Sequence, residues 1–390
     1  MKNKITALLF IALIFVCGAG TVYKSYGEIL DMVKNGDLDS KTPKKIESVI
    51  QDQMYKKIWW IDIHGLTQRI LDRSVVDEPG SDVYRLSDGS LSGGCGWKKD
   101  EKLEKFAANI NKVRERISPE VDLLYVQLPF KVDTNDQMPP GVKSYANENC
   151  DRLLAAIEGY GIETLDIRKC IHEEGLNWPD LFYKTDHHWR PQTAMWAAGK
   201  ISEYLAEEHG YAYDASLYDP DNMDTEVFPD LFLGSLGRRT GSLYAGTDDF
   251  ELVTPSYETH FDFRSYPGDI EIHREGSFRE ALIDDGNLKK DYYNINNYAA
   301  YTGDSTKTST TINFDPINHK KILLVRDSYS CALQPFLSLS QEQVTTIDLR
   351  YYRDESVIDH INNNDYDLVI IAYTPSAFDK ERFTFHKIPE

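Results

Sequence analysis

Uncharged residues run without a break from position 5 to position 23, directly behind a start that contains two lysines. The run is long enough to cross a bilayer, since a membrane-spanning helix needs about 20 apolar residues. A basic start followed by such a run is typical of a signal anchor or a signal peptide, here residues 1–23. We favour an uncleaved anchor, although the small residues Gly18, Ala19 and Gly20 leave cleavage open. We therefore place the rest of the chain outside the cytoplasm.

The pattern changes after the apolar run. Residues 24–58 are polar and charged, and we interpret them as a stalk. From residue 59 to residue 390, segments with helical spacing of apolar positions alternate with short runs of strand-forming residues. The predicted helices are residues 103–117, 152–160, 191–208, 329–339 and 355–361, and the predicted strands are residues 121–130, 162–167, 322–325, 344–349 and 368–372. This alternation predicts a three-layer α/β domain with a mainly parallel sheet and helices on both faces.

The alternation fails between about residues 211 and 312. This stretch is rich in Asp, Gly, Tyr and Thr and contains only short strand-like pieces. We interpret it as a β-rich insertion that packs on or beside the main sheet of the 59–390 domain.

Composition excludes some classes of function. The chain of 390 residues has a formal net charge of −20, and such a surface repels nucleic-acid phosphates. The five cysteines form no C-x-x-C pair and no Cys/His spacing of a zinc site, so we predict neither a metal nor a cofactor. Aromatic residues make up 12% of the chain, which is a weak hint of carbohydrate binding because aromatic residues more often fill cores.

Ser328 is the first candidate for chemistry. The apolar strand at 322–325 leads into Arg326-Asp327-Ser328, and a helix follows. In a parallel sheet this turn lies at the carboxyl end of a strand, where open α/β sheets bind ligands. It also lies near a helix N-terminus, whose N–H groups can hold an oxyanion. Taken alone, the segment fits a helix cap better, because serine is favoured at that position.

A second segment supplies partners for a serine nucleophile. Asp186, His187 and His188 precede a helix that starts at Pro191. In an extended backbone, residues two apart point the same way, so Asp186 and His188 would share a side and His187 would point away. A serine hydroxyl needs an imidazole as general base and a carboxylate to fix the tautomer of that imidazole. A metal site at the histidine pair is a weaker alternative, because no segment supplies a third ligand.

A Gly-Asp-Ser sequence at Gly303, Asp304 and Ser305 imitates the motif of many esterases. It lies in a polar loop with no clear buried strand before it and no helix after it. A nucleophile needs a rigid mount. We therefore prefer Ser328 to Ser305.

The sequences TDHHW at 185–189 and ILLVRDSYS at 322–330 together resemble the DHHW protein family. That family is similar to the alginate O-acetyltransferase-like branch of SGNH hydrolase-fold proteins, and the resemblance covers residue 60 to the end. It implies a three-layer SGNH-hydrolase-like fold with Ser328 as nucleophile, His188 as general base and Asp186 as the residue that orients His188. The serine follows the Asp-His pair, as in that branch. Arg326 stands two positions before Ser328, where the common motif has glycine, which puts the shape of the oxyanion pocket in doubt.

The resemblance also implies an activity. In that branch, acetyl groups are transferred to an extracellular polysaccharide, and a membrane-bound O-acyltransferase partner passes the acyl group outward. We therefore expect an extracytoplasmic O-acetyltransferase that modifies a cell-surface or exported polysaccharide. An acetyl esterase with the same triad is the alternative enzyme. A catalytically silent glycan-binding or assembly protein of this fold is the alternative outside enzymes.

Four further residues are expected at the pocket. The oxyanion donors should be the backbone N–H of Tyr329 and one N–H from a second loop, for which we choose Gly234 because glycine allows close approach. An ordinary turn glycine is the simpler interpretation of Gly234. Arg350 and Tyr351 follow the predicted strand at 344–349 and should face the same cleft.

Overall fold

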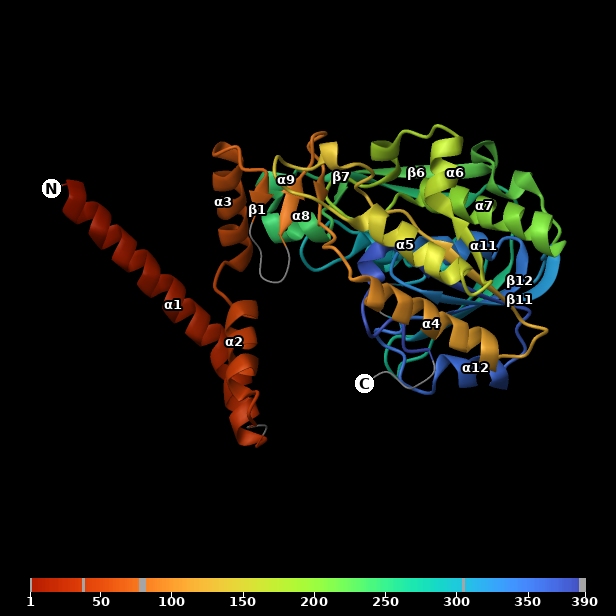
Figure 1. The fold of residues 1–390 in the computed structure, drawn as a ribbon. Coiled ribbons are helices and arrows are strands. Elements are labelled where there is room, and N and C mark those ends of the chain that lie inside the picture. The colour runs from red at the N-terminus through yellow and green to blue at the C-terminus, as the bar shows by residue number, and fades with distance from the viewer. Residues whose placement is uncertain (1, 37–38, 77–81, 304–305, 386–390) are drawn as a thin grey trace. The chain divides into compact units, whose positions relative to one another are not determined.

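The computed structural model describes residues 2–36, 39–76, 82–303 and 306–385. The chain forms two compact units. One comprises Met1–Asp72 with Thr240–Tyr244, and the other comprises Arg73–Arg239 with Ala245–Glu390. Figure 1 labels most of the helices and some of the strands.

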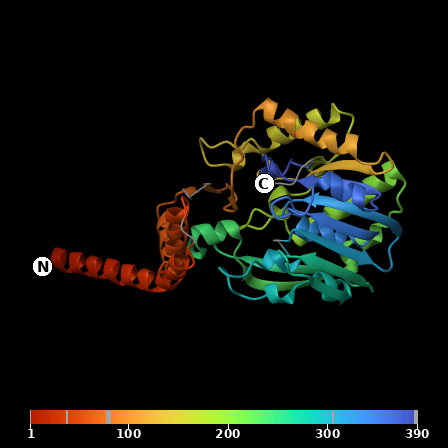
Figure 2. The same ribbon diagram turned by 90° about the horizontal axis from the view of Figure 1, so that it is seen from below.

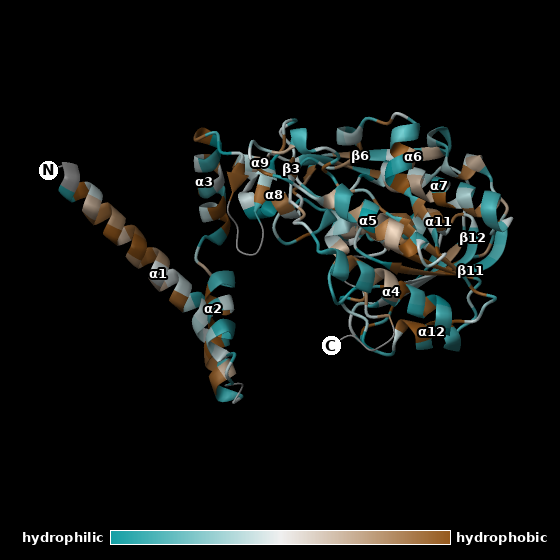
Figure 3. Ribbon diagram, viewed as in Figure 1, coloured by the Kyte–Doolittle hydropathy of each residue, from teal (hydrophilic) through white to brown (hydrophobic). Residues whose placement is uncertain are grey.

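The smaller unit is helical. It contains α1 (Lys2–Lys34), α2 (Thr42–Asp52) and α3 (Lys57–Ile70). Among the described residues, one helix, from Lys4 to Lys34, is long and apolar enough to cross a membrane, and Figure 3 shows brown, hydrophobic residues along the middle of this ribbon. This agrees with the predicted anchor. The chain beyond α2 returns to α1, because the N–H of Tyr55 donates to Thr21 Oγ1 at 3.0 Å. The division at residues 23 and 58 stays a prediction.

The larger unit contains the main sheet. Its strands are β4 (Asp122–Gln127), β5 (Glu163–Asp166), β8 (Phe261–Tyr266), β9 (Ile272–Gly276), β10 (Thr308–Asn313), β11 (Asn318–Arg326), β12 (Gln341–Ile347) and β13 (Leu368–Tyr373). Their order across the sheet is β5, β4, β13, β11, β12, β10, β8, β9. Neighbours from β5 through β12 are parallel, and those from β12 to β9 are antiparallel. The sheet is therefore mixed and mostly parallel, as expected.

Alternate residues of the parallel strands enter two separate cores. Leu124, Ile322 and Ile370 belong to one core, and Leu123, Leu323 and Ile371 to the other. The first core is covered by α6 (Ile167–Glu173), α7 (Pro191–His209) and α11 (Ser330–Leu337), and the second by α4 (Asp100–Arg116), α5 (Ala146–Glu158) and α12 (Val357–Asn363). Parallel strands buried on both faces need continuous apolar runs. This is the three-layer α/β arrangement that the alternation predicted.

The predicted β-rich insertion contributes directly to the sheet. Its strands β8, β9 and β10 extend the sheet beyond β12, and Figure 2 shows this green to cyan part of the chain at the end of the sheet away from the orange helix α4. The remaining elements of this stretch are the paired strands β6 (Met223–Phe232) and β7 (Asp248–Pro255) and the short helices α8 (Ser235–Thr240), α9 (Ser242–Ala245) and α10 (Phe278–Leu282). A small three-stranded sheet, β1 (Val75–Val76), β2 (Val83–Arg85) and β3 (Leu91–Ser92), precedes α4.

Candidate active site

Ser328 lies in the turn between β11 and α11, at the carboxyl end of a buried parallel strand. Asp327 fixes this turn. Its Oδ1 accepts the N–H of Tyr329 at 3.0 Å, and its Oδ2 accepts both the N–H and the hydroxyl of Thr374 at 2.8 Å. Because Thr374 directly follows β13, the turn is tied to the neighbouring strand. The predicted strand–turn–helix is present, and it gives the serine a rigid mount.

The histidine segment is a short closed loop. Phe182 and Trp189 pair across its base, and the residues between them form bends rather than a strand. The side chain of Asp186 accepts the N–H of His188 at 2.9 Å. This is an Asx turn, in which aspartate binds the backbone two residues on. The extended backbone that the sequence suggested is therefore replaced by a turn.

The structure brings Ser328, His188 and Asp186 together. His188 Nε2 lies 2.8 Å from Ser328 Oγ, and His188 Nδ1 lies 2.6 Å from Asp186 Oδ1. Ser328 and His188 are 140 positions apart in the chain. Asp186 and His188 are buried, whereas Ser328 is partly exposed. These distances are those at which a base can take a proton from a hydroxyl.

The electrostatics favour an ionised Asp186. Burial alone would raise its pKa. The attraction of a protonated His188, a smaller electrostatic contribution from the His187 ring and the hydrogen bonds from His188 outweigh burial and bring the pKa well below 3.8. The carboxylate thus stays charged at neutral pH, as the partner of an imidazole that gains a proton must.

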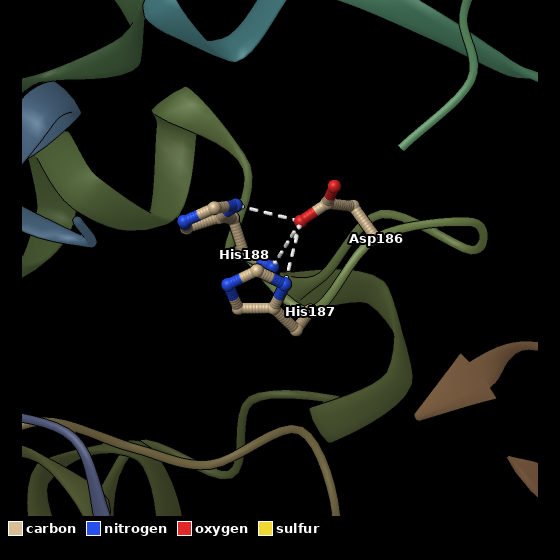
Figure 4. A group of neighbouring side chains, drawn as sticks. All are labelled: Asp186, His187 and His188. Atoms are coloured by element: carbon tan, nitrogen blue, oxygen red, sulfur yellow. Dashed lines mark hydrogen bonds and ion pairs between the residues drawn. The ribbon is translucent and has the colours of Figure 1, made fainter. Parts of the chain in front are cut away.

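His187 does not point away from this group, so that prediction was wrong. Its Nδ1 lies 3.2 Å from Asp186 Oδ1 and 3.0 Å from Ser235 Oγ, and its ring lies 3.9 Å from the His188 ring. Figure 4 shows both imidazoles at the same carboxylate. The turn at Asp186 is the reason, because the alternation of sides holds only for extended backbone. Burial and the neighbouring His188 lower the pKa of His187 to about 3, so His187 is neutral at pH 7.

The same three residues are the geometric basis of the metal alternative. Asp186, His187 and His188 each offer a ligand atom within 4.8 Å of the others. However, a carboxylate oxygen and a nitrogen 2.6 Å apart already share a hydrogen bond. A metal ion bound by both atoms would have to replace that bond. The arrangement fits proton transfer better than metal ligation.

Gly234 is placed against Asp186 and not as an oxyanion donor. Its N–H donates to Thr185 Oγ1 at 2.8 Å, and the N–H of Ser235 donates to Asp186 Oδ2. A Cβ at position 234 would lie 2.3 Å from the Cβ of Asp186, so only glycine fits there. The predicted close approach is real, but its target is the carboxylate and its N–H is already engaged.

Tyr329 is also not the predicted donor, because its N–H is bound to Asp327. The side chain of Tyr329 instead contacts the histidine loop, since its hydroxyl donates to the carbonyl oxygen of His187. Its own carbonyl oxygen accepts the indole N–H of Trp189 at 3.1 Å. Tyr329 thus fastens the serine turn to the histidine loop.

Arg350 and Tyr351 follow β12, as predicted. Arg350 donates from Nε and Nη2 to Asp348 Oδ2, at 3.0 and 2.6 Å, and its guanidinium lies 5.1 Å from the ring of Tyr351. Asp348 is fully buried, whereas Tyr351 is 40% exposed. Contact of these two residues with substrate stays a prediction.

Comparisons with known proteins support the predicted resemblance. Residues 97–226 match the model of the SGNH hydrolase-like domain of acetyltransferase AlgX. PatB1 of Bacillus cereus, in a structure with a sulfonyl adduct, superposes with a TM-score of 0.63 at 18% identity over 78% of this chain and 98% of that chain. A DHHW family protein from Eubacterium siraeum gives a TM-score of 0.61 at 18% identity over 80% of this chain and 96% of that chain. No curated protein matches the chain.

This chain has an SGNH hydrolase-like fold. The predicted resemblance to DHHW and alginate O-acetyltransferase-like proteins is confirmed. The matched range of the SGNH-like domain includes Asp186 and His188 and ends before Ser328.

Two residues that contact the histidine loop were missed by sequence reasoning. Asp248, at the start of β7, accepts the N–H groups of Lys184 and Thr185 at 2.7 and 2.8 Å and the hydroxyl of Thr185 at 2.6 Å. Tyr298 stacks on the His188 ring with the centroids 4.0 Å apart, and its hydroxyl donates to the carbonyl oxygen of Tyr329. Both belong to the insertion, where no local pattern marks them.

Tyr298 comes from the segment that precedes the Gly-Asp-Ser decoy. Residues 297–300 of this segment are buried, so it is not simply a polar loop. Asp304 and Ser305 themselves lie outside the described residues.

Lys131 binds the backbone of the histidine loop. Its buried ammonium donates to the carbonyl oxygens of Tyr183, Lys184 and Asp186, the last two at 3.1 and 2.9 Å. An ammonium has three N–H donors, and all three are used. Burial lowers the pKa of Lys131 to about 8, which brings its titration close to neutral pH. A neutral amine donates fewer hydrogen bonds, so the loop loses part of its support when Lys131 is deprotonated.

We expect Lys131→Met to lower activity about 10- to 100-fold at pH 7, because small displacements of reacting groups have effects of that size. The wild type should lose activity as the pH rises through about 8, and the Met variant should lack that decline. Rates measured between pH 6 and 10 with a soluble acetyl ester test this. Lys143→Met, at an exposed position, is the matched control.

Global unfolding would not explain the decline. Since the pKa of Lys131 is lower in the folded chain than the usual 10.5, the unfolded chain binds more protons between pH 8 and 10.5. This group's contribution to stability is fully present above 10.5 and is lost as the pH falls through 8. The contribution of Lys131 to folding stability therefore increases with pH while activity falls. If Lys131→Met lost activity at alkaline pH as the wild type does, the prediction would be wrong.

Proposed function

We propose that this protein is an extracytoplasmic O-acetyltransferase that acts on a cell-surface or exported polysaccharide through Ser328, His188 and Asp186. The observation that carries the proposal is the continuous hydrogen-bonded series from Asp186 Oδ1 through the His188 ring to Ser328 Oγ. The match of residues 97–226 to the SGNH hydrolase-like domain of an acetyltransferase supports this choice of reaction.

In the first half of the reaction, Ser328 Oγ attacks the carbonyl carbon of the acetyl donor. Its proton passes to His188 Nε2, which lies 2.8 Å away. Asp186 stabilises the imidazolium that forms and keeps the proton of Nδ1 in place. When the tetrahedral intermediate collapses, the bond to the donor breaks, His188 returns the proton to the leaving group, and the acetyl ester of Ser328 remains.

In the second half, a sugar hydroxyl replaces the leaving group. The oxygen of the sugar hydroxyl attacks the acetyl carbon while His188 takes the proton of that hydroxyl. His188 then protonates Ser328 Oγ as the ester bond to Ser328 breaks. The products are an O-acetylated sugar and free serine. Water in place of the sugar gives hydrolysis, so partial exposure of Ser328 keeps the acetyl esterase as the second candidate.

The oxyanion requires a donor other than Tyr329. The N–H of Ser328 itself has no acceptor among the residues that the structure describes, whereas the next N–H is engaged by Asp327. We assign the free N–H of Ser328 to the oxyanion, since preorganised donors of this kind stabilise the developing charge.

The N-terminal helix supports the proposed location, and the family resemblance suggests the partner. A helix that can cross a membrane would hold the domain at the outer surface, beside an exported glycan. The acetyl group would then come from a membrane-bound O-acyltransferase. A signal peptide cleaved from a secreted protein is the other possibility for this helix.

A sulfonyl fluoride should modify Ser328, as the sulfonyl adduct of PatB1 suggests for a similar fold. The labelling rate should fall about 10²-fold or more in His188→Ala, because general-base assistance is worth that much. Intact mass and peptide mapping locate the adduct, and chain unfolded in guanidinium chloride serves as the unreactive control. Labelling of another residue, or at a rate independent of His188, would favour the catalytically silent glycan-binding protein.

A further inference from the structure

A hollow of about 650 Å³ lies in the larger unit, outside the triad. Neither Ser328 nor His188 lines it. Its lining is mixed, with the aromatic side chains of Phe182 and Trp196 and the polar side chains of Gln192 and Glu251. Its volume is within the usual range for small-ligand sites.

The hollow adjoins the histidine loop. Phe182 and Trp189 close that loop at its base, and Lys184 and Arg190, one inside the loop and one just after it, both line the hollow. One flank of the loop thus carries His188 toward Ser328, while other residues of the same loop form part of the hollow. A glycan held here would lie next to the reacting residues without occupying their place.

Two hydrogen-bond acceptors on residues that line the hollow lack donors. Glu251 Oε2 accepts from Arg190 Nη1 at 3.1 Å and from Gln192 Nε2 at 2.8 Å. Among the described residues, Glu251 Oε1 has no partner, and neither has the buried Oε1 of Gln192. A buried acceptor without a donor is unfavourable. Gln192 Oε1 is closed off from the hollow, so a ligand that brings hydroxyl or amine donors would bind Glu251 Oε1.

The aromatic part of the lining is suited to the apolar face of a sugar ring. The indole of Trp196 is partly exposed and is fixed by its N–H, which donates to Glu174 Oε2 at 2.8 Å. Aromatic side chains beside a few oriented polar groups are the usual lining of a small-ligand site, and C–H groups of sugars pack on such rings.

The charged side chains that line the hollow indicate which glycans it can bind. The polar lining holds three carboxylates, Asp88, Asp180 and Glu251, against two cations, Lys184 and Arg190. This balance disfavours a polyanion such as a uronate polymer. It suits neutral sugars, or sugars with an amine that the carboxylates can bind.

We propose that this hollow is a second glycan-binding site, which holds a neutral or amine-bearing sugar unit of the acceptor chain while another unit reacts at Ser328. The identity of the ligand as the acceptor rests on the proposed function, whereas the binding itself does not require catalysis.

Calorimetry on the full chain in detergent tests the site with three probes, tetramers of β-1,4-linked N-acetylglucosamine, of β-1,4-linked glucosamine and of uronate. We expect one of the first two to bind at least about 10-fold more tightly than the uronate. Trp196→Ala should weaken that binding about 10-fold, and Glu251→Met, which keeps the volume but removes the acceptor, should also weaken it. Trp97→Ala, at an exposed tryptophan of the same unit, should not. Thermal unfolding checks that each variant is folded.

Binding in Ser328→Ala separates the two proposals. If it retains tetramer binding and loses acetyl transfer, both stand. If Ser328→Ala keeps full transfer while binding depends on Trp196, the proposed function fails and the site stands. If no tetramer binds, or if Trp97→Ala weakens binding as much as Trp196→Ala, the proposed site is wrong whatever the catalytic result.

Discussion

Ser328→Ala should reduce acetyl transfer by at least about 10³-fold, and His188→Ala should reduce it almost as far. The two side chains are 2.8 Å apart and act in one proton transfer, so neither is useful without the other. The double variant should therefore be no worse than Ser328→Ala, because losses within such a unit do not add. Release or transfer of acetyl from a model ester, compared among the three variants, measures this.

The control for these variants is Ser330→Ala. Ser330 is a buried serine at the start of α11, two positions from Ser328 and outside the hydrogen-bonded series. It should retain most of the activity. Losses that add fully in the double variant would show that Ser328 and His188 work independently, against the proposed mechanism.

Asp186→Asn should reduce acetyl transfer about 10⁴-fold, which is the typical effect of forcing the wrong tautomer on the imidazole. An amide would offer His188 Nδ1 either an N–H or a weaker acceptor in place of the carboxylate, at a contact of 2.6 Å. It would also no longer carry the charge that balances the imidazolium. Steady-state rates for the purified variant, with thermal unfolding to check the fold, give the comparison.

His187→Ala is the informative companion to Asp186→Asn. The His187 ring is neutral and approaches the same carboxylate at 3.2 Å, so its loss should reduce activity by about 10-fold, much less than the loss of the charge. If His187→Ala proved as severe as Asp186→Asn while His188→Ala remained active, the general base would have to be reassigned.

The strand–turn–helix at Ser328 could be predicted because apolar period and turn position are local properties of the sequence. The pairing of Ser328 with the Asp186–His188 segment depended on the resemblance and on the rule that parallel strands meet at one edge. The orientation of His187 could not be read in this way. It depends on a turn that the side chain of Asp186 itself creates, and the prediction of an extended backbone did not include this turn.

The assignment of the Tyr329 N–H to the oxyanion failed for a related reason. Asp327 stands two residues before Tyr329, just as Asp186 stands before His188, and in both cases the carboxylate accepts the later N–H. Aspartate at such a position is a known turn former, so this signal was present in the sequence. The contacts of Gly234, Asp248 and Tyr298 left no such signal, because they join segments about 50 to 110 positions from the loop that they support.

The stretch from 211 to 312 has the sequence pattern of an insertion in the α/β domain, yet it supplies Gly234, Asp248 and Tyr298. A shortened chain that joined residue 210 to residue 313 would keep Asp186, His188, Ser328 and all the parallel strands. It would lose the glycine against the carboxylate, the aspartate beneath Thr185 and the ring that covers His188. Trimming toward a minimal enzyme should therefore yield a protein with every reacting group and no fixed arrangement of them. In this molecule the residues proposed to react and the residues that hold them in place come from different stretches of the chain.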